Sequence, residues 1–176
     1  MRFVPIALSG ALLIEIEPRS DERGLFARTF CEREFADHKI PTHYPQCNTS
    51  FNHRRGTIRG LHFQSPPHEE PKVVRCTRGS IFDVIVDLRR DSVTLRQWYG
   101  VELTEDNRRA IYVPPGFAHG FQTLSDNAEV YYQMGAAYVP DAAAGICWND
   151  PAIGIRWPLP VSTISQRDAS LPNFSP

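Results

Sequence analysis

The chain of 176 residues lacks an excess of either charge, because 19 lysines and arginines nearly balance 20 aspartates and glutamates. The formal net charge of -1 argues against a general nucleic-acid-binding protein. Lysine is almost missing: Lys39 and Lys72 are the only two, and the other basic residues are arginines. Arginine makes forked contacts with phosphate, so a local phosphate pocket is still compatible with this balance.

Motifs that define several common enzyme classes are also missing. The sequence has no glycine-rich phosphate loop of the dinucleotide or Walker type, which argues against a Rossmann or P-loop enzyme. No two cysteines have CxxC or zinc-finger spacing. We therefore expect reduced thiols in a cytoplasmic protein at four scattered positions: Cys31, Cys47, Cys76 and Cys147.

The apolar stretch 3–14 is the segment that most resembles a signal peptide. It is too short to span a bilayer, and no small-x-small cleavage site follows it. Polar and apolar residues alternate directly after it, so a first β-strand over residues 11–17 is the better prediction. We expect no membrane partner.

Period-two alternation dominates the rest of the chain. Within 81–88, for example, Ile81 and Ile85 face one way, and Val84 and Val86 face the other. Turn signals separate further expected strands at 73–76, 98–103, 109–113, 118–124, 129–134 and 153–157. One short helix is expected at 31–39, and an extended segment after residue 157. The pattern predicts an all-β sandwich or barrel that comprises residues 1–176 as a single domain.

Four polar stretches interrupt this patterning, at 21–26, 46–50, 56–63 and 114–121. The spacing from Gly56 to His62 is that of the first cupin motif, and Pro114-x-Gly116-x-x-His119 has the spacing of the second. Cupins are jelly-roll β-barrels whose motif histidines bind a metal inside the barrel. We therefore expect a cupin-like jelly-roll β-barrel with short flanking helices.

A metal is not expected in this barrel. Gln64 stands where the second metal-ligating histidine of a cupin would be, which leaves only His62 and His119 as ligands. Two imidazoles without a placed carboxylate make a weak metal site. Proton chemistry by the histidines is one interpretation, and two core histidines satisfied by hydrogen bonds is another. The polar residues Gln46, Arg59 and Lys72 favour the first, since a barrel core does not need them.

Signatures along nearly the whole chain resemble those of the dTDP-4-dehydrorhamnose 3,5-epimerase family. They are DERGLF at 21–26, QCN at 46–48, TIRGLHFQ at 57–64, RGSIFDVIVDLR at 78–89, IYVPPGFAHGF at 111–121 and QRDASLP at 166–172. The resemblance implies epimerisation of a nucleotide-linked 4-keto-6-deoxy sugar at C3 and C5, for which the chemistry needs no redox cofactor. A base on one face of the ring and an acid on the other perform each inversion.

The resemblance also implies roles for individual residues. His62 is the base, Tyr132 the opposing acid, Asp168 the partner of His62, and Lys72 the group that stabilises the enolate. The substrate's nucleotide and phosphates are expected at seven positions: Arg23, Gln46, Asn48, Arg59, His119, Tyr138 and Arg167. A homodimer is implied as well, in which the N-terminal strand that carries Arg23 is a plausible exchanged element.

Several alternatives stay open. Arg23 is also explained as a turn residue, Tyr132 as a core residue, and Asp168 as a helix N-cap. The chain departs from the family at Arg28, where a glutamate is usual, and at the alanines around Ala143, where an acidic residue is common, so specificity is in doubt. The rivals are a 3-epimerase, an epimerase of another nucleotide sugar, a non-catalytic sugar-binding cupin and a metal-dependent cupin oxygenase.

Overall fold

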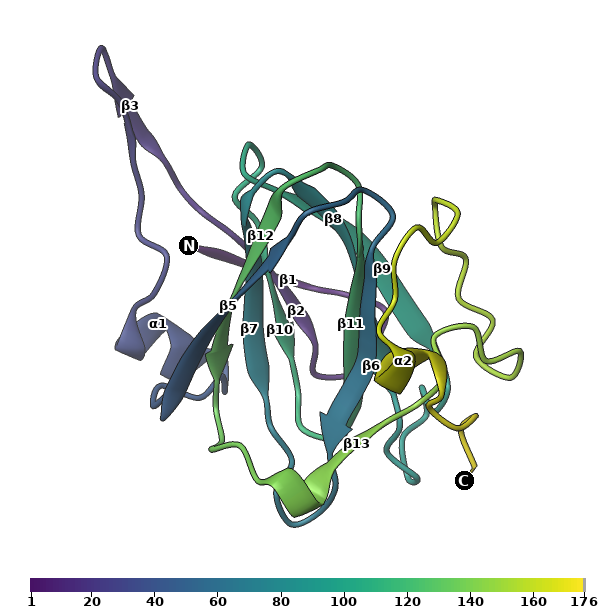
Figure 1. Cartoon of the computed structure of the whole chain (residues 1–176). Coiled ribbons are helices and arrows are strands. Elements are labelled where there is room, and N and C mark those ends of the chain that lie inside the picture. The colour runs from purple at the N-terminus through teal and green to yellow at the C-terminus, as the bar shows by residue number, and fades with distance from the viewer. Residues whose placement is uncertain (176) are drawn as a thin grey trace.

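The computed structural model describes residues 1–175 and consists largely of antiparallel strands (Figure 1). One sheet has six strands in the order β1-β2-β10-β7-β12-β5. Their bounds are β1 Arg2–Pro5, β2 Leu12–Glu15, β5 Gln46–Asn52, β7 Lys72–Arg78, β10 Ala110–Val113 and β12 Ala128–Met134.

A second sheet faces the first and has five strands in the order β13-β6-β11-β8-β9. Their bounds are β6 Ile58–Gln64, β8 Ser80–Asp87, β9 Trp98–Thr104, β11 Phe117–Thr123 and β13 Ala143–Gly145. The remaining elements are the hairpin β3 Arg19–Asp21 and β4 Gly24–Phe26, the helices α1 Glu32–Asp37 and α2 Gln166–Ala169, and the 3-10 turn η1 Pro140–Ala142. The cupin-like jelly-roll prediction is thereby confirmed. No helix within residues 1–175 is long and apolar enough to cross a membrane.

The alternation of β8 shows how the two faces of its sheet are buried. Ile81 and Ile85 pack into the core between the sheets, together with Val74 and Val130 from the facing sheet. Val84 and Val86 point to the outer face, which the segment that follows β13 covers through residues such as Ile146 and Ile153. The predicted two-faced pattern of this strand is therefore confirmed, and both faces are buried.

Glycines allow β6 and β11 to approach closely beside the future site. Gly60 has a φ of +122°, and a Cβ there would lie 2.6 Å from the Cα of Gly120. A Cβ on Gly120 would in turn lie 2.6 Å from the carbonyl oxygen of Arg59. The pairing register shifts at this point, between His119 and Phe121, and His62 lies directly opposite His119. The glycines of the two motifs thus set the strand geometry that brings these histidines together.

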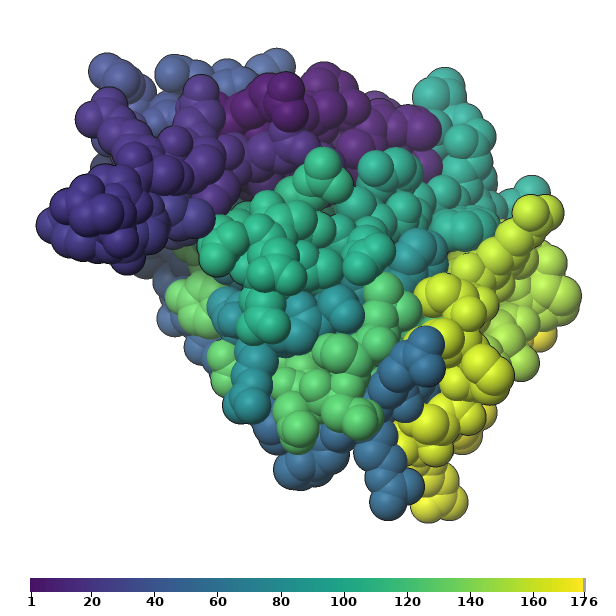
Figure 2. All heavy atoms as spheres, turned by 90° about the horizontal axis from the view of Figure 1, so that it is seen from above, coloured from purple at the N-terminus to yellow at the C-terminus, as the bar shows by residue number. Residues whose placement is uncertain are grey.

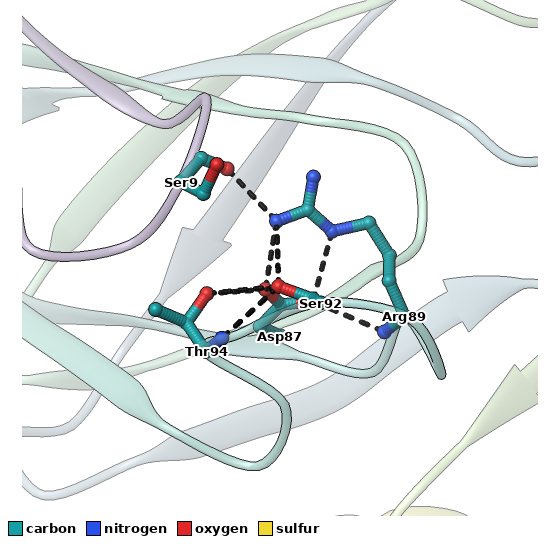
Figure 3. Close-up of polar contacts among 5 residues, drawn as sticks. All are labelled: Ser9, Asp87, Arg89, Ser92 and Thr94. Atoms are coloured by element: carbon teal, nitrogen blue, oxygen red, sulfur yellow. Dashed lines mark hydrogen bonds and ion pairs between the residues drawn. The ribbon is translucent and has the colours of Figure 1, made fainter.

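A buried carboxylate fixes the loop between β8 and β9 (Figure 3). Asp87 accepts hydrogen bonds from the side chains of Arg89, Ser92 and Thr94. Arg89 also donates to the carbonyl oxygen of Ser9 at 2.8 Å and lies over the ring of Phe117. The side chain of Asp87 is fully buried. Its four partners close this end of the barrel without an apolar plug.

The β3–β4 hairpin is the one element that leaves the body of the protein (Figures 1 and 2). Its residues are exposed, including the apolar side chains of Leu25 and Phe26. From above, the purple hairpin extends from one side of the molecule, and the yellow C-terminal segment lies on the other. Next to the hairpin in sequence, α1 buries Phe35 against the outer face of the six-stranded sheet.

Most sequence-predicted elements are confirmed, with shifts of a few residues at their ends. The predicted strand at 153–157 is wrong, because these residues form a turn and a loop that pack Ile153 and Trp157 on the outer face of the barrel. The predicted helix at 31–39 shortens to α1, and the expected strand at 11–17 shortens to β2. The tail contains α2, which was not expected, and all four cysteines are free.

Candidate active site

A cavity of about 310 Å³ lies between the two sheets. It is bounded where β6 and β12 end and where β5 and β7 begin, because Gln64, Met134, Gln46 and Lys72 all line it. The predicted site residues that line it are Gln46, Asn48, Arg59, His62, Lys72, His119, Tyr132, Tyr138 and Arg167. Residues more than 100 positions apart in sequence therefore meet in one place.

His62 projects from β6 and is held by a carboxylate from the tail. Its Nε2 lies 2.8 Å from Oδ1 of Asp168, whose Oδ2 accepts a hydrogen bond from the backbone N–H of Gly60. Ser165 caps α2 by accepting from the Asp168 N–H, so Asp168 itself is not the N-cap. Burial alone would raise the pKa of Asp168, but the hydrogen bonds from His62 and Gly60 outweigh it and lower that pKa. The carboxylate therefore stays ionised, accepts the Nε2 proton, and leaves Nδ1 of His62 as a base.

Tyr132 lies on β12, in the sheet that faces His62. Its ring packs against the barrel core and meets the ring of His119 edge-on, with centroids 6.0 Å apart. Burial raises the pKa of Tyr132 well above its ordinary value, and this outweighs the opposite effect of a hydrogen bond with Ser50. Tyr132 is therefore a protonated phenol at neutral pH, which suits a proton donor.

Two further charged pairs stand in or beside the cavity. Nε2 of His119 lies 2.8 Å from Oδ2 of Asp83, and both side chains are almost fully buried. Nζ of Lys72 lies 3.0 Å from Oε1 of Glu70, and Glu70 itself lines the cavity. Sequence reasoning missed Glu70, although it lies only two residues before the singled-out Lys72.

Arginine and amide side chains surround the rest of the cavity. Arg59 is exposed and donates from Nε to Oδ1 of Asn52 at 2.7 Å. Gln46 accepts a hydrogen bond from the backbone N–H of Tyr138, which fixes the loop that presents the half-exposed Tyr138 ring. Arg167 precedes Asp168 on α2 and lines the same cavity. These side chains provide cations, donors and an aromatic face, the features that a nucleoside diphosphate needs.

Arg23 is the predicted site residue that the cavity of its own chain does not contain. It lies on the turn of the β3–β4 hairpin, where it pairs with Asp21 and is largely exposed. Arg28, the first departure from the family pattern, pairs with Glu34 at 2.7 Å and also lies outside the cavity. Ala143 and Ala144 do line the cavity, so the second departure replaces an acidic wall by methyl groups.

The residues at the cupin metal positions do not fit a metal ion. Nε2 of His62 is bonded to Asp168, and Nε2 of His119 to Asp83. Gln64 accepts the backbone N–H of Val139 and donates to two carbonyl oxygens, so its amide ties loops together. Within residues 1–175, no group of three or more His, Cys, Asp or Glu side chains could hold a metal ion.

Fold and cavity together define an acid–base enzyme of the cupin-like jelly-roll class. The chain belongs to the dTDP-4-dehydrorhamnose 3,5-epimerase family, whose sequence profile matches residues 5–176. The epimerase of that name from Methanothermobacter thermautotrophicus is 48% identical over 160 residues, which cover 90% of this chain and 84% of the relative. The predicted enzyme class, an epimerase of nucleotide-linked sugars, is confirmed.

Solved structures agree with the sequence relatives. The epimerase of Bacillus anthracis, with TDP and PPi bound, superposes with a TM-score of 0.95 at 38% identity and covers 98% of this chain and 99% of its own. A dTDP-6-deoxy-D-glucose-3,5-epimerase from Legionella pneumophila, in complex with dTDP-4-keto-L-rhamnose, has a TM-score of 0.90 at 33% identity and covers 99% of both chains.

Proposed function

We propose that residues 1–176 form one catalytic domain that converts dTDP-4-dehydro-6-deoxy-D-glucose into dTDP-4-dehydro-L-rhamnose by inverting C3 and C5. The observation that carries this proposal is that His62 and Tyr132 line the same cavity from strands of facing sheets. A sugar ring placed between them has a base on one face and an acid on the other. Inversion at carbon requires this arrangement, whereas sugar binding alone does not.

The C4 ketone of the substrate makes the protons at C3 and C5 acidic. Nδ1 of His62 removes one of these protons, and Asp168 stabilises the imidazolium that forms. Negative charge moves to the C4 oxygen, where the ammonium of Lys72 stabilises the enolate. Tyr132 then donates its proton to the opposite face of the carbon. His62 returns its proton to solvent and Tyr132 regains one before the second centre reacts.

The nucleotide end of the substrate occupies the remaining wall of the cavity. Arg59, Arg167 and His119 are suited to the diphosphate, and Gln46 and Asn48 add hydrogen bonds. The exposed ring of Tyr138 provides a flat face for the base. The nucleotide and sugar ligands of the Bacillus and Legionella structures support this assignment.

We propose that the hairpin brings Arg23 to the cavity of a second copy of the chain, so the enzyme is a homodimer. The exposed side chains of Leu25 and Phe26 support this, because an isolated hairpin has little reason to present them to water. No nucleic-acid or membrane partner is proposed. The four free thiols favour a cytoplasmic location.

The decisive experiment is incubation of the enzyme with dTDP-4-dehydro-6-deoxy-D-glucose in heavy water. Deuterium at both C3 and C5 of an inverted product is expected. Label at C3 alone would identify a 3-epimerase, and binding without label would identify a sugar-binding module. We also propose that no metal is needed, because Gln64 and both histidines are bonded elsewhere. Activity lost to a chelator and restored by one divalent ion would overturn that part.

A further inference from the structure

The cavity contains one ion pair that the proposed reaction has not yet used. Lys72 and Glu70 approach within 3.0 Å, and their side chains are only 6% and 9% exposed. Among the described residues that line the cavity, Glu70 supplies the one carboxylate. A negative charge opposes the binding of a diphosphate, so its retention inside this cavity calls for a local benefit.

The backbone around Glu70 is fixed on both sides. The carbonyl oxygen of Pro71 accepts a hydrogen bond from the N–H of Gly135 at 2.8 Å, just after β12. Gly135 itself lies against Pro71, since a Cβ there would be 2.7 Å from its Cγ. Further back in the loop, Gln64 donates to the carbonyl oxygen of His68 at 3.0 Å. Glu70 is therefore held in place, and its contact with Lys72 is built into the loop.

We propose that Glu70 is a positioning residue for the epimerisation, which keeps the buried Lys72 protonated and directs its Nζ towards the C4 oxygen. The proposal rests on the proposed function, because it assigns Lys72 to the enolate. Burial favours the neutral amine, which cannot stabilise an enolate by charge. A carboxylate 3.0 Å away favours the ammonium. Glu70 thus maintains the charge that the reaction needs at this wall of the cavity.

The other groups that face the cavity carry positive charge or none, so they do not replace Glu70. They are Arg59 and His62 on β6, His119 on β11, Tyr132 on β12, Tyr138 in the following loop, and Arg167 on α2. Asp83 lies behind His119 and is engaged by it. Loss of Glu70 would leave Lys72 among cations, which favours its neutral form further.

The test compares pH–rate profiles of Glu70→Gln and wild type, with dTDP-4-dehydro-6-deoxy-D-glucose as substrate. We measure the entry of solvent deuterium into the sugar in a Tyr132→Phe background, so that Tyr132 cannot supply the alkaline limb. Glu70→Gln should move this limb to lower pH by about one unit or more, within the range that buried lysines show. The rate at pH 8 should then fall about tenfold more than the rate at pH 6.

Glu69→Gln is the matched control, because it removes the neighbouring charge and Glu69 lines a different surface hollow. Its profile should coincide with the parent. A Glu70→Gln limb that coincides with both overturns the proposal, as does a lower plateau with an unmoved limb, which is the mark of a merely structural role. If Glu70→Gln does not fold, Glu70→Asp should retain the limb and lower the plateau, and an unchanged plateau overturns the proposal. Failure of the wild type to exchange any deuterium would instead refute the proposed function.

Discussion

His62 and His119 are directly opposite each other on neighbouring strands, yet their surroundings assign them different roles. Each imidazole bonds a carboxylate through Nε2 at 2.8 Å. The side chain of His62 is 39% exposed, whereas that of His119 is 5% exposed and its partner Asp83 is fully buried. An accessible imidazole can exchange protons with substrate and solvent, so His62 is the better base.

Replacement of His62 by asparagine should remove nearly all turnover and leave nucleotide binding intact. General-base catalysis contributes about 10² to 10⁴ in rate, and the arginines that bind phosphate are untouched. Turnover and dTDP affinity are measured side by side. His68→Asn, at an exposed histidine in the next loop, should keep the parental rate. A His62→Asn rate above about a tenth of wild type would mean that the base lies elsewhere.

Replacement of Tyr132 by phenylalanine should separate proton removal from inversion. His62 can still remove a proton and return solvent deuterium to the same face, so recovered substrate should carry label while inverted product becomes scarce. Phenylalanine keeps the ring that packs in the core. The control is Tyr131→Phe, because neighbouring strand residues point to opposite faces. Inversion at the wild-type rate by Tyr132→Phe would make Tyr138 or a bound water the next acid to test.

At the scale of elements, the strands that form the cavity were the hardest to predict. Apolar alternation identified β8, because both of its faces are packed. The strands β5 and β6 carry polar residues such as Asn48, Arg59 and His62 on their inner side, so the stretches that contain them were interpreted as interruptions of β structure. A strand that lines a polar cavity loses the hydrophobic signal by which strands are predicted.

The Asp87 network makes the β8–β9 loop sensitive to acid. Although burial opposes ionisation, hydrogen bonds from Arg89, Ser92 and Thr94 lower the pKa of Asp87 to about 2, from an ordinary value of 3.8. A depressed pKa in the folded state stabilises the fold above the ordinary pKa. This contribution, roughly 2 kcal/mol, disappears as the pH falls from about 4 to 2.

Asp87→Asn should therefore lower the free energy of unfolding by roughly 2 kcal/mol at pH 6, with a difference from wild type that shrinks towards pH 2. Denaturant titrations at several pH values measure this difference. Asp91→Asn, at an exposed carboxylate in the same loop, should change stability by less than about 0.5 kcal/mol. A difference for Asp87→Asn that stays constant over the whole pH range would show that the carboxylate is not the source.

At the scale of the whole molecule, the hairpin allows the dimer to be tested by complementation. Arg23→Ala and His62→Asn should each be nearly inactive alone. If Arg23 acts in the cavity of the partner, a mixed dimer has one cavity with both His62 and Arg23 intact. Co-expression of the two variants should then restore up to about half the activity of each mixed dimer. No recovery, or a mass near 20 kDa in solution, would contradict the shared site.

The sequence predicted the residues of the site better than their partners. Spacing and resemblance identified His62, Lys72 and Tyr132, because motif residues can be read along one chain. The ion pair of Lys72 with Glu70 depends on how a loop folds back, and the exposure of Arg23 depends on where a hairpin points. Neither leaves a periodic signal. The tail was predicted as extended, although Ser165 and Asp168 have the spacing of a capped helix turn.

The tail also means that the catalytic pair is less robust than the barrel. Asp168 reaches His62 from a four-residue helix in a terminal segment joined to the body by bonds such as those from Ile58 to Thr163 and from Cys147 to Pro172. Segments of this kind open at a smaller free energy than a packed sheet. On heating, the enzyme should fall silent while its sheets still give a native spectrum, so activity is the more sensitive thermometer of this protein.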